Sequence, residues 1–359
     1  MENTFTCLNC SNSIQINDDT NLITCSHCES EFDLLAIKEY KNLNKQDFKK
    51  LYWEKYEEKS GSGDWTSEEK SLISSFVCPH CGSEMMTNNN AQTDECPFCM
   101  SKLSILGTLD GTFRPDLIIP FAHDKETAKK QFASYFSKKK LLPKLFKSEE
   151  NLKNIQGVYV PVWLYDCKLS GKLNYNATKD DTAKDGSTEK GISSHYAVIR
   201  DGELDFKKIP SCASKKVDEI TMEALEPFNY DECEPFNINY LNDFIAEQYD
   251  VEPSEMQEVI NHIIASSFSN ELMKTFRGYS SNSLVYKSFS APISKINYAL
   301  IPVWILNTKY KGRKYSVTLN GQFEKFTGVL PIDKQKQTAY FLAITSLISI
   351  IISALTIFF

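Results

Sequence analysis

The chain carries the cysteine spacing Cys7-x2-Cys10-x14-Cys25-x2-Cys28 and repeats it 71 positions later as Cys78-x2-Cys81-x14-Cys96-x2-Cys99. Each cluster offers four thiolates, which is the number that a tetrahedral structural zinc ion takes. A site closed by four cysteines leaves no coordination position open for chemistry. The spacing therefore predicts two zinc ribbons, each with one structural Zn2+ ion, that form a platform and do not catalyse.

Disulfide bonds are the alternative use of these eight cysteines. A disulfide framework needs an oxidising compartment, which proteins usually reach through a secretion signal. The residues before Cys7 contain neither a basic n-region nor an apolar h-region, so we expect no signal peptide. His27 and His80 lie inside Cys-x2-Cys pairs, but four cysteines already fill each site, and we expect both to be exposed knuckle residues. Zinc binding is expected to supply most of the folding free energy of such small units.

Short strands are expected around the cysteine pairs, and a mainly helical linker between the ribbons. Residues 13–16 and 22–24 are predicted to pair across a turn rich in Asn and Asp. Third strands are expected at 31–35 and 102–106. In the linker we predict a helix over 36–59, a flexible break at Ser60-Gly-Ser-Gly63, and a capping box, Thr66-x-x-Glu69, that opens a helix to Phe76.

Composition and charge bound the function. The chain has 359 residues, 42% of them hydrophobic and 12% aromatic, which suits two or three folded domains and excludes a disordered protein. Its formal net charge is −7 and its pI is about 5.5. Two four-thiolate zinc sites would move the charge to about −11. Nucleic-acid binders usually carry a basic patch or a high pI, so only a local patch such as Lys138–Lys140 could serve that role.

Residues 339–359 contain no charged side chain. A helix of that length spans about 31 Å, which matches the ~30 Å hydrocarbon core of a bilayer. A buried core helix is the alternative, but such a helix normally has a polar stripe. This segment has only Ser and Thr, whose hydroxyls can bond back to their own helix. We therefore predict one transmembrane helix, with the lipid bilayer as a partner.

The orientation of this helix follows from the charges beside it. Residues 309–336 carry a net charge of +5, and basic flanks remain on the cytoplasmic side. We therefore predict a single-pass protein of the cell membrane whose N-terminal body faces the cytoplasm. The basic flank either touches anionic lipid, at about 1 kcal/mol per cation, or is solvated and only sets the topology.

The middle of the chain is rich in predicted strands and contains an internal repeat. Gly157-Val-Tyr-Val-Pro-Val-Trp163 resembles the stretch that ends in Pro302-Val-Trp304, and Tyr196–Gly202 parallels Tyr315–Gly321. The dipeptides Asp201-Gly202 and Asn320-Gly321, which end the two parallel stretches, predict hairpins. In the first copy of the repeat, a polar insertion at about 178–194 is expected to separate the Pro-Val-Trp stretch from Tyr196–Gly202. The two tryptophans either line a ligand groove or, more often, anchor a core.

A helical insertion at about 217–278 is predicted between the two halves. Residues 240–249 and 255–276 show apolar side chains at helical spacing. Residues 218–258 contain thirteen acidic residues and no Lys or Arg. This stretch is either a solvated acidic face or a docking surface for a basic partner.

Together these features predict a multi-domain α+β protein with two four-cysteine zinc ribbons, a duplicated β-rich domain and one C-terminal transmembrane helix. The expected boundaries are ribbon 1 at 1–35, a helical linker at 36–76, ribbon 2 at 77–107, the duplicated β-rich domain with its helical insertion at 108–335, and the transmembrane helix at 339–359.

The chain resembles a family of bacterial membrane proteins described as TFIIB-type zinc ribbon-containing. The resemblance rests on the paired ribbons, the Pro-Val-Trp repeats, the apolar tail and the stretches Pro115–Phe121, Leu141–Phe146, Leu225–Tyr230 and Tyr240–Asp250. It implies no binding residue beyond the eight zinc ligands. Some relatives are associated with SPFH-type scaffold proteins and the phage-shock membrane-stress system, which implies a role in anchoring cytoplasmic partners.

Three classes of function compete. An enzyme needs an activated nucleophile, an acid–base pair or an open metal site. Of the three cysteines outside the clusters, Cys167, Cys212 and Cys233, only Cys212 is a plausible nucleophile, and the sequence indicates no base for it. Nucleic-acid binding, in transcription or replication, is the alternative that the low pI and the apolar tail disfavour. We therefore predict a non-enzymatic, membrane-anchored adaptor or scaffold that docks cytoplasmic proteins.

Overall fold

The computed structural model describes residues 4–7, 12–15, 22–28, 31–33, 64–88, 95–107, 112–185, 188–217 and 219–358. Cys10, the predicted helix over 36–59 and the break at 60–63 lie outside these residues. The chain divides into two compact units. Unit 1 comprises Met1–Glu58, Tyr165–Ile209 and Ser254–Ile296, and unit 2 comprises Lys59–Leu164, Pro210–Pro253 and Asn297–Phe359.

The described elements give a mixed α+β fold. The strands are β1 (Thr4–Thr6), β2 (Ser13–Gln15), β3 (Leu22–Thr24), β4 (Glu31–Asp33), β5 (Ile73–Val77), β6 (Glu84–Asn88), β7 (Ser104–Gly107), β8 (Leu117–Ile118), β9 (Gln156–Asp185), β10 (Thr188–Cys212), β11 (Glu234–Pro235), β12 (Ile245–Glu247), β13 (Ser281–Tyr310), β14 (Arg313–Asn320) and β15 (Phe326–Gly328). The helices are α2 (Ser67–Leu72), α3 (Lys125–Ser137), η2 (Lys144–Lys147), α4 (Glu149–Lys153), α5 (Glu219–Leu225), η3 (Tyr230–Glu232), η4 (Ile238–Leu241), α6 (Gln257–Met273) and α7 (Lys334–Phe358).

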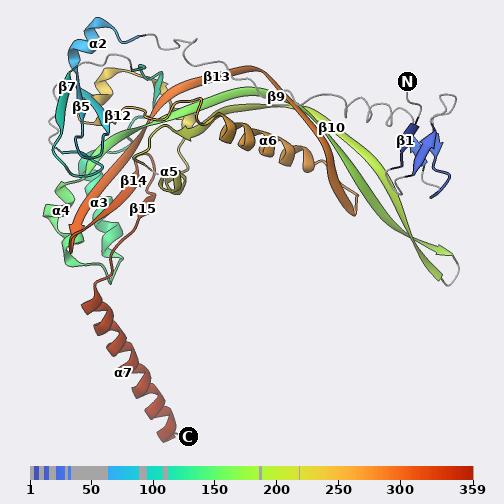
Figure 1. The fold of residues 1–359 in the computed structure, drawn as a ribbon. Helices are drawn as coiled ribbons and strands as arrows, with labels where there is room; N and C mark the ends of the chain where they lie inside the picture. Colours follow the sequence, from blue (N-terminus) through green and yellow to red (C-terminus); the bar gives the residue numbers. More distant parts are fainter. Residues whose placement is uncertain are drawn as a thin grey trace. The chain divides into compact units, whose positions relative to one another are not determined.

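In unit 1, α6 packs along the long strands (Figure 1). Phe268 of α6 is fully buried, and its ring lies edge-on to Phe289 of β13 at 5.7 Å. A Cβ atom at Gly171 of β9 would come within 2.5 Å of the Phe268 ring. Glycine at this position therefore lets helix and strand approach closely. The helix predicted over 255–276 is confirmed, with Ile260, Ile264 and Phe268 on its buried face.

Unit 2 is built on a mixed sheet whose main strand order is β11-β8-β13-β9-β12-β6-β5-β7. Short β8 runs parallel to β13, and short β12 runs parallel to β9 and antiparallel to β6. One face of the sheet buries an aliphatic cluster that includes Val160, Val162 and Ile301, together with Leu225 from α5. The other face buries a second cluster, which includes Trp304 together with Phe132 and Phe136 of α3. The sheet therefore has a covered core on both sides.

The two Pro-Val-Trp strands have matching neighbours. Val158 of β9 pairs with Ile245 of the short parallel strand β12. Ala299 occupies the same place in β13, three residues before its proline, and pairs with Leu117 of the short parallel strand β8.

The hydrogen bonds beyond the prolines match as well. The Pro161 carbonyl accepts the N–H of Ala213 at 3.0 Å, and the Pro302 carbonyl accepts the N–H of Gly321 at 2.9 Å. A second hydrogen bond repeats at 3.0 Å in both places: the N–H of Asp250 donates to the Ala213 carbonyl, and the N–H of Ala122 donates to the Gly321 carbonyl. By these contacts Gly321 corresponds to Ala213, and the sequence-based pairing of Gly321 with Gly202 is not the structural one.

Both tryptophans are core anchors, which confirms the more common of the two interpretations. Trp163 and Trp304 are 0% and 1% exposed. Trp163 packs against Tyr249 at 5.1 Å, and Trp304 packs against Phe121 at 4.7 Å. The Nε1–H of Trp163 donates to the Val251 carbonyl at 2.8 Å.

Two sequence predictions in this region are wrong. Residues 240–249 form η4 and then β12 instead of a helix, because Ala246 is held between Tyr159 of β9 and Met86 of β6. The insertion at 217–278 is therefore not purely helical.

Asp201-Gly202 makes no hairpin, because both residues lie inside β10. The polar residues 178–194 continue β9 and β10 wherever they are described.

The segment that leads into the second cysteine cluster begins as predicted and ends differently. Thr66 and Glu69 form the full capping box of α2. The helix stops at Leu72, short of the predicted Phe76, because Ile73 takes an extended conformation and starts β5. Strand β5 pairs with both β6 and β7, so the pairing around the second cluster starts at Ile73.

Helix α7 extends away from the rest of unit 2 (Figure 1). Residues 334–355 are long and apolar enough to cross a membrane, and the apolar window in them has no buried residue. A core helix would be covered by the fold, so this finding does not fit the alternative of a buried core helix.

Candidate metal centre

The first half of the second cluster lies in the β5–β6 hairpin. Val77 pairs with Glu84 at the ends of these strands, and Cys78 and Cys81 lie in the connection. The N–H of Cys78 donates to the Ser83 carbonyl at 2.9 Å, and the N–H of Gly82 donates back to the Cys78 carbonyl at 2.8 Å. Gly82 has φ +72°, a left-handed conformation that glycine adopts without steric cost.

The second half repeats this geometry. An antiparallel bridge joins Glu95 to Lys102 and encloses Cys96 and Cys99. The N–H of Cys96 donates to the Ser101 carbonyl at 2.8 Å, and the N–H of Met100 donates to the Cys96 carbonyl at 2.9 Å. Met100 has φ +64°, although its side chain makes that conformation unfavourable. This left-handed position could not be predicted from the sequence, because a methionine stands where the first half has a glycine.

The sulfur positions fit a tetrahedral metal. Cys78 Sγ lies 3.3 Å from Cys99 Sγ, and Cys81 Sγ lies 3.7 Å from Cys96 Sγ. All four sulfurs are within 4.8 Å of one another. With Zn–S bonds of about 2.3 Å, tetrahedral geometry requires S···S edges of about 3.8 Å. Disulfide sulfurs would be about 2.05 Å apart, and the four cysteines are free thiols.

The electrostatics of the cluster favour a bound cation. Burial opposes the charge on Cys99, but hydrogen bonds from Ser101, Cys78 and Cys96 lower its pKa to about 6. Burial raises the pKa of Cys96 far above its usual value, and the charge on Cys81 adds to this effect. Four thiolates so close together repel one another, so all four ionise together only beside a cation such as Zn2+.

The cluster is built into the core of unit 2. Cys78 and Cys96 are buried with Met85 and Ile245, and Phe98 packs on both this group and the aliphatic cluster of the sheet. The side-chain amide of Asn307 in β13 donates to the Pro97 carbonyl inside the second Cys-x2-Cys pair. A metal here would therefore stabilise the docking of the cysteine loops on the sheet.

The first cluster has the same plan in its described part. Cys7 Sγ lies 3.5 Å from Cys28 Sγ, and Cys7, Cys25 and Cys28 group within metal-binding distance. The N–H of Cys7 donates to the Asn12 carbonyl at 2.7 Å. Cys10, the predicted fourth ligand, lies outside the described residues.

The strand pairing around the first cluster differs from the prediction. Strand β2 pairs with β1 and β3 pairs with β4, in two separate sheets, whereas residues 13–16 and 22–24 were predicted to pair with each other. Cys7 therefore follows the first strand of one antiparallel pair, and Cys25 follows the first strand of the other. His27 and His80 are exposed, as predicted, and belong to neither cysteine group.

The three cysteines outside the clusters are buried or partly buried in the fold. Burial, with the charges of Asp166 and Asp205, raises the pKa of Cys167 to about 12, so this thiol stays protonated. Cys212 Sγ donates to the carbonyls of Ser214 at 3.5 Å and Val217 at 3.6 Å. Cys233 packs, partly buried, on the aliphatic cluster of the sheet.

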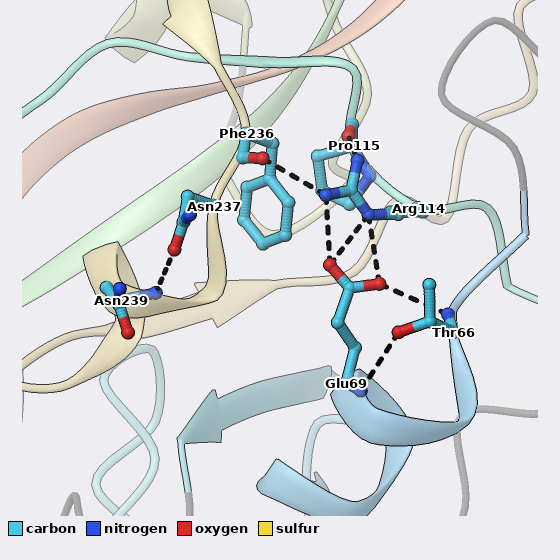
Figure 2. A network of polar contacts seen from close by, with 7 residues as sticks. All are labelled: Thr66, Glu69, Arg114, Pro115, Phe236, Asn237 and Asn239. Atoms are coloured by element: carbon cyan, nitrogen blue, oxygen red, sulfur yellow. Dashed lines mark hydrogen bonds and ion pairs between the residues drawn. The ribbon is translucent and has the colours of Figure 1, made fainter.

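An ion pair fastens α2 to the segment before β8. Figure 2 shows the guanidinium of Arg114 facing the carboxylate of Glu69, with Nε to Oε1 at 3.0 Å and Nη2 to Oε1 at 2.9 Å. Nη2 also donates to the Phe236 carbonyl at 3.1 Å. Burial opposes the charge on Glu69, but hydrogen bonds from Arg114 and Thr66 hold its pKa below the usual value. The pair is an architectural contact, because it joins α2 to the segment before β8 and to the Phe236 carbonyl.

No family model and no solved structure matches the chain. The uncharacterized protein YdjG of Bacillus subtilis (strain 168) is 31% identical over 233 residues, which cover 65% of this chain and 68% of that protein.

Proposed function

Because the chain belongs to the family of the uncharacterized Bacillus subtilis protein YdjG, whose name assigns no activity, we propose a function from its own residues. The protein is a membrane-anchored zinc-ribbon adaptor that docks cytoplasmic proteins at the membrane. The observation that carries this proposal is a closed four-cysteine cluster, built into a unit whose last helix is apolar and uncovered. Such a metal site has no position for a substrate.

Each cysteine cluster holds one structural Zn2+ ion as a zinc ribbon. The S···S separations of 3.3–3.7 Å in the second cluster support this assignment. In the first cluster, the Cys-x2-Cys spacing supports Cys10, which lies outside the described residues, as the fourth ligand beside Cys7, Cys25 and Cys28. When bound, the metal cross-links two hairpin loops and adds its binding free energy to folding.

The β-rich region is an internal duplication. In each copy a short strand precedes a helix, a long Pro-Val-Trp strand and a further strand. The first copy would contain β8, α3, β9 and β10, and the second would contain β12, α6, β13 and β14. Support comes from the matched carbonyls of Pro161 and Pro302, which accept the N–H groups of Ala213 and Gly321. The short strand of each copy pairs with the long strand of the other, which would make the two copies inseparable.

Helix α7 anchors the protein as a single transmembrane span. The net charge of +5 over residues 309–336 supports a cytoplasmic location for the flank and the body before it. The family resemblance in the ribbons and Pro-Val-Trp repeats supports a partner of the SPFH or phage-shock type. The ribbons and the β-rich domain would then present a docking platform at the cytoplasmic face.

The test is purification of the intact chain from gently solubilised membranes after chemical cross-linking, followed by identification of its companions. We expect specific protein partners with the wild-type chain and their loss with Cys78→Ser/Cys96→Ser. A Cys212→Ser variant is the matched control, because it removes a thiol outside both clusters, and it should keep the partners. A wild-type chain that returns alone, or that is found in the soluble fraction, would end the proposal.

A further inference from the structure

The start of α7 is hydrogen-bonded to a lysine-rich segment from a distant part of the sequence. The N–H of Asp333 donates to the Leu141 carbonyl at 2.8 Å. The Nζ of Lys336 donates to the Leu142 carbonyl at 2.6 Å. The segment 138–147, which contains η2, therefore lies beside the start of α7.

A buried aromatic side chain holds this segment against a hairpin tip. Phe146 is 1% exposed, and its ring is edge-on to Tyr310 at 6.1 Å and to Tyr315 at 5.9 Å. Tyr310 pairs with Arg313 across the two-residue turn between β13 and β14. The hairpin tip therefore lies beside the same segment. We call residues 138–147, 309–314 and 329–336 together the basal rim.

The basal rim is strongly basic. Segment 138–147 contains five lysines and no acidic residue. Among the described residues none of these five has a carboxylate partner: Lys139 lies 4.9 Å from the centre of the Tyr135 ring, and Lys147 donates to the Ser137 carbonyl. Glu149 and Glu150 follow on α4 and are exposed. The acidic residue of the rim itself is Asp333, whose carboxylate accepts the N–H groups of Gln335 and Lys336. The basic residues that the rim offers are Lys138, Lys139, Lys140, Lys144, Lys147, Lys309, Lys311, Arg313, Lys334 and Lys336. Lys314 also belongs to the rim by position, but it interacts with Cys81, Cys96 and Cys99.

Apolar side chains stand exposed among these cations. Leu145, Val329 and Ile332 are 44%, 78% and 55% exposed. Aliphatic side chains mixed with lysines are typical of surfaces that lie in the headgroup region of a bilayer. Lysine stems can follow the apolar surface while the ammonium groups reach the phosphates.

We propose that the basal rim binds the headgroups of anionic lipids around the entry point of α7. The inference rests on the proposed function, because α7 must span a bilayer to bring the rim to its surface. It adds a specific lipid-binding surface, centred on segment 138–147, to the flank that sets the topology. Nucleic acid is the other polyanion that five lysines could bind, but a chain with net charge −7 does not attract it overall.

Amide hydrogen exchange of the full-length, zinc-loaded chain in lipid nanodiscs tests the proposal. One set of discs contains phosphatidylcholine alone, and the other contains phosphatidylcholine with about one-third phosphatidylglycerol. The amides of 138–147 should exchange about 5-fold more slowly in the anionic discs, the factor expected when one lysine is held at the surface at about 1 kcal/mol. Added salt should reduce the difference, because it screens surface charge.

Charge reversal supplies the matched comparison. Lys138→Glu/Lys140→Glu/Lys144→Glu should abolish the slowing, whereas Lys70→Glu/Lys207→Glu/Lys295→Glu, at exposed lysines outside the rim, should keep it. Equal exchange in both kinds of disc would overturn the lipid-binding rim alone. Slowing in neutral discs on addition of duplex DNA, without slowing in anionic discs, would assign the rim to nucleic acid and overturn it as well. A chain that does not enter the discs would overturn the anchor and the rim together.

Discussion

The guanidinium of Arg114 and the carboxylate of Glu69 form a two-point ion pair whose side chains are only 17% and 16% exposed. Glu69 also completes the capping box of α2, and Arg114 lies 5.1 Å from the centre of the Phe236 ring. Through this pair the helix that leads into the second cysteine cluster is fastened to the chain before β8. The position of the cluster thus depends on contacts outside its own loops.

Replacement of Arg114 by Lys should lower the free energy of unfolding by about 1–3 kcal/mol, because an ammonium group cannot keep the forked geometry. Urea unfolding of the detergent-solubilised chain measures this change. Lys129→Ala is the control, because Lys129 pairs with Glu126, a side chain that is 70% exposed, and such pairs contribute 0–1 kcal/mol. Equal effects of the two substitutions would refute the structural role of Arg114.

Metal analysis should find two zinc ions per chain in protein purified without chelators. Cys78→Ser/Cys96→Ser should reduce the content to about one, because two ligands cannot hold a structural site. Cys212→Ser should leave it at two. A chain that contains no zinc, or a content that does not respond to the double substitution, would contradict the assignment.

Gly82 and Met100 form a matched pair of left-handed positions at which substitutions should act in opposite directions. Gly82→Ala should weaken zinc binding by the second cluster roughly 5-fold or more, since a left-handed non-glycine residue costs about 1–2 kcal/mol. A Cβ atom at Gly82 would meet no atom within 4 Å, so the effect is purely conformational. Met100→Gly should strengthen binding by a similar factor. Competition with a chromophoric chelator measures both, and effects of the same sign would be evidence against the shared geometry.

Glu247 should make stability fall as the pH rises from about 4.3 to 8. Its side chain is 1% exposed, and burial, reinforced by Asp250 and only partly offset by the hydrogen bond from Ser214, raises its pKa to about 8. The native carboxyl therefore keeps its proton over a range in which the unfolded chain, with a pKa of about 4.3, has lost it.

Glu247→Gln removes this titration and should raise the free energy of unfolding at pH 8 by several kcal/mol, at about 1.4 kcal/mol per unit of pKa difference, with little change near pH 4. Unfolding measured at several pH values checks the expectation. Glu258→Gln, at an exposed position of α6, should leave the slope unchanged. A wild-type slope in the Glu247→Gln variant would show that another group titrates.

The sequence predicted best where the governing interactions are local. The four ligands of the second cluster are encoded in two short loops, and their sulfurs converge as the spacing requires. Helix α6 follows from a 3.6-residue period that places Ile260, Ile264 and Phe268 on one face. The capping box of α2 is also a local signal, because Thr66 and Glu69 are one helical turn apart.

Predictions failed where pairing partners are distant in sequence. Ile245 and Ala246 lie in a run with apparent helical spacing, and they become a strand only because β9 and β6 lie on either side of them. Asp201-Gly202 is typical of a turn, but both residues lie within the long strand β10. The proximity of Leu141 to Asp333 had no sequence signal, because the two residues are far apart in the chain and meet only in the folded unit.

The most direct test of α7 as a membrane anchor is alkaline carbonate extraction of membranes from cells that express the chain. The wild-type chain should stay in the membrane pellet. A variant with Leu347→Lys and Ile351→Lys, which places two charges in the apolar stretch of α7 at about 2.5–3.5 kcal/mol each, should move to the supernatant with its zinc still bound. A wild-type chain that is released by carbonate, or a double-lysine variant that remains in the pellet, would contradict the account of α7 as the membrane anchor of a zinc-bearing body.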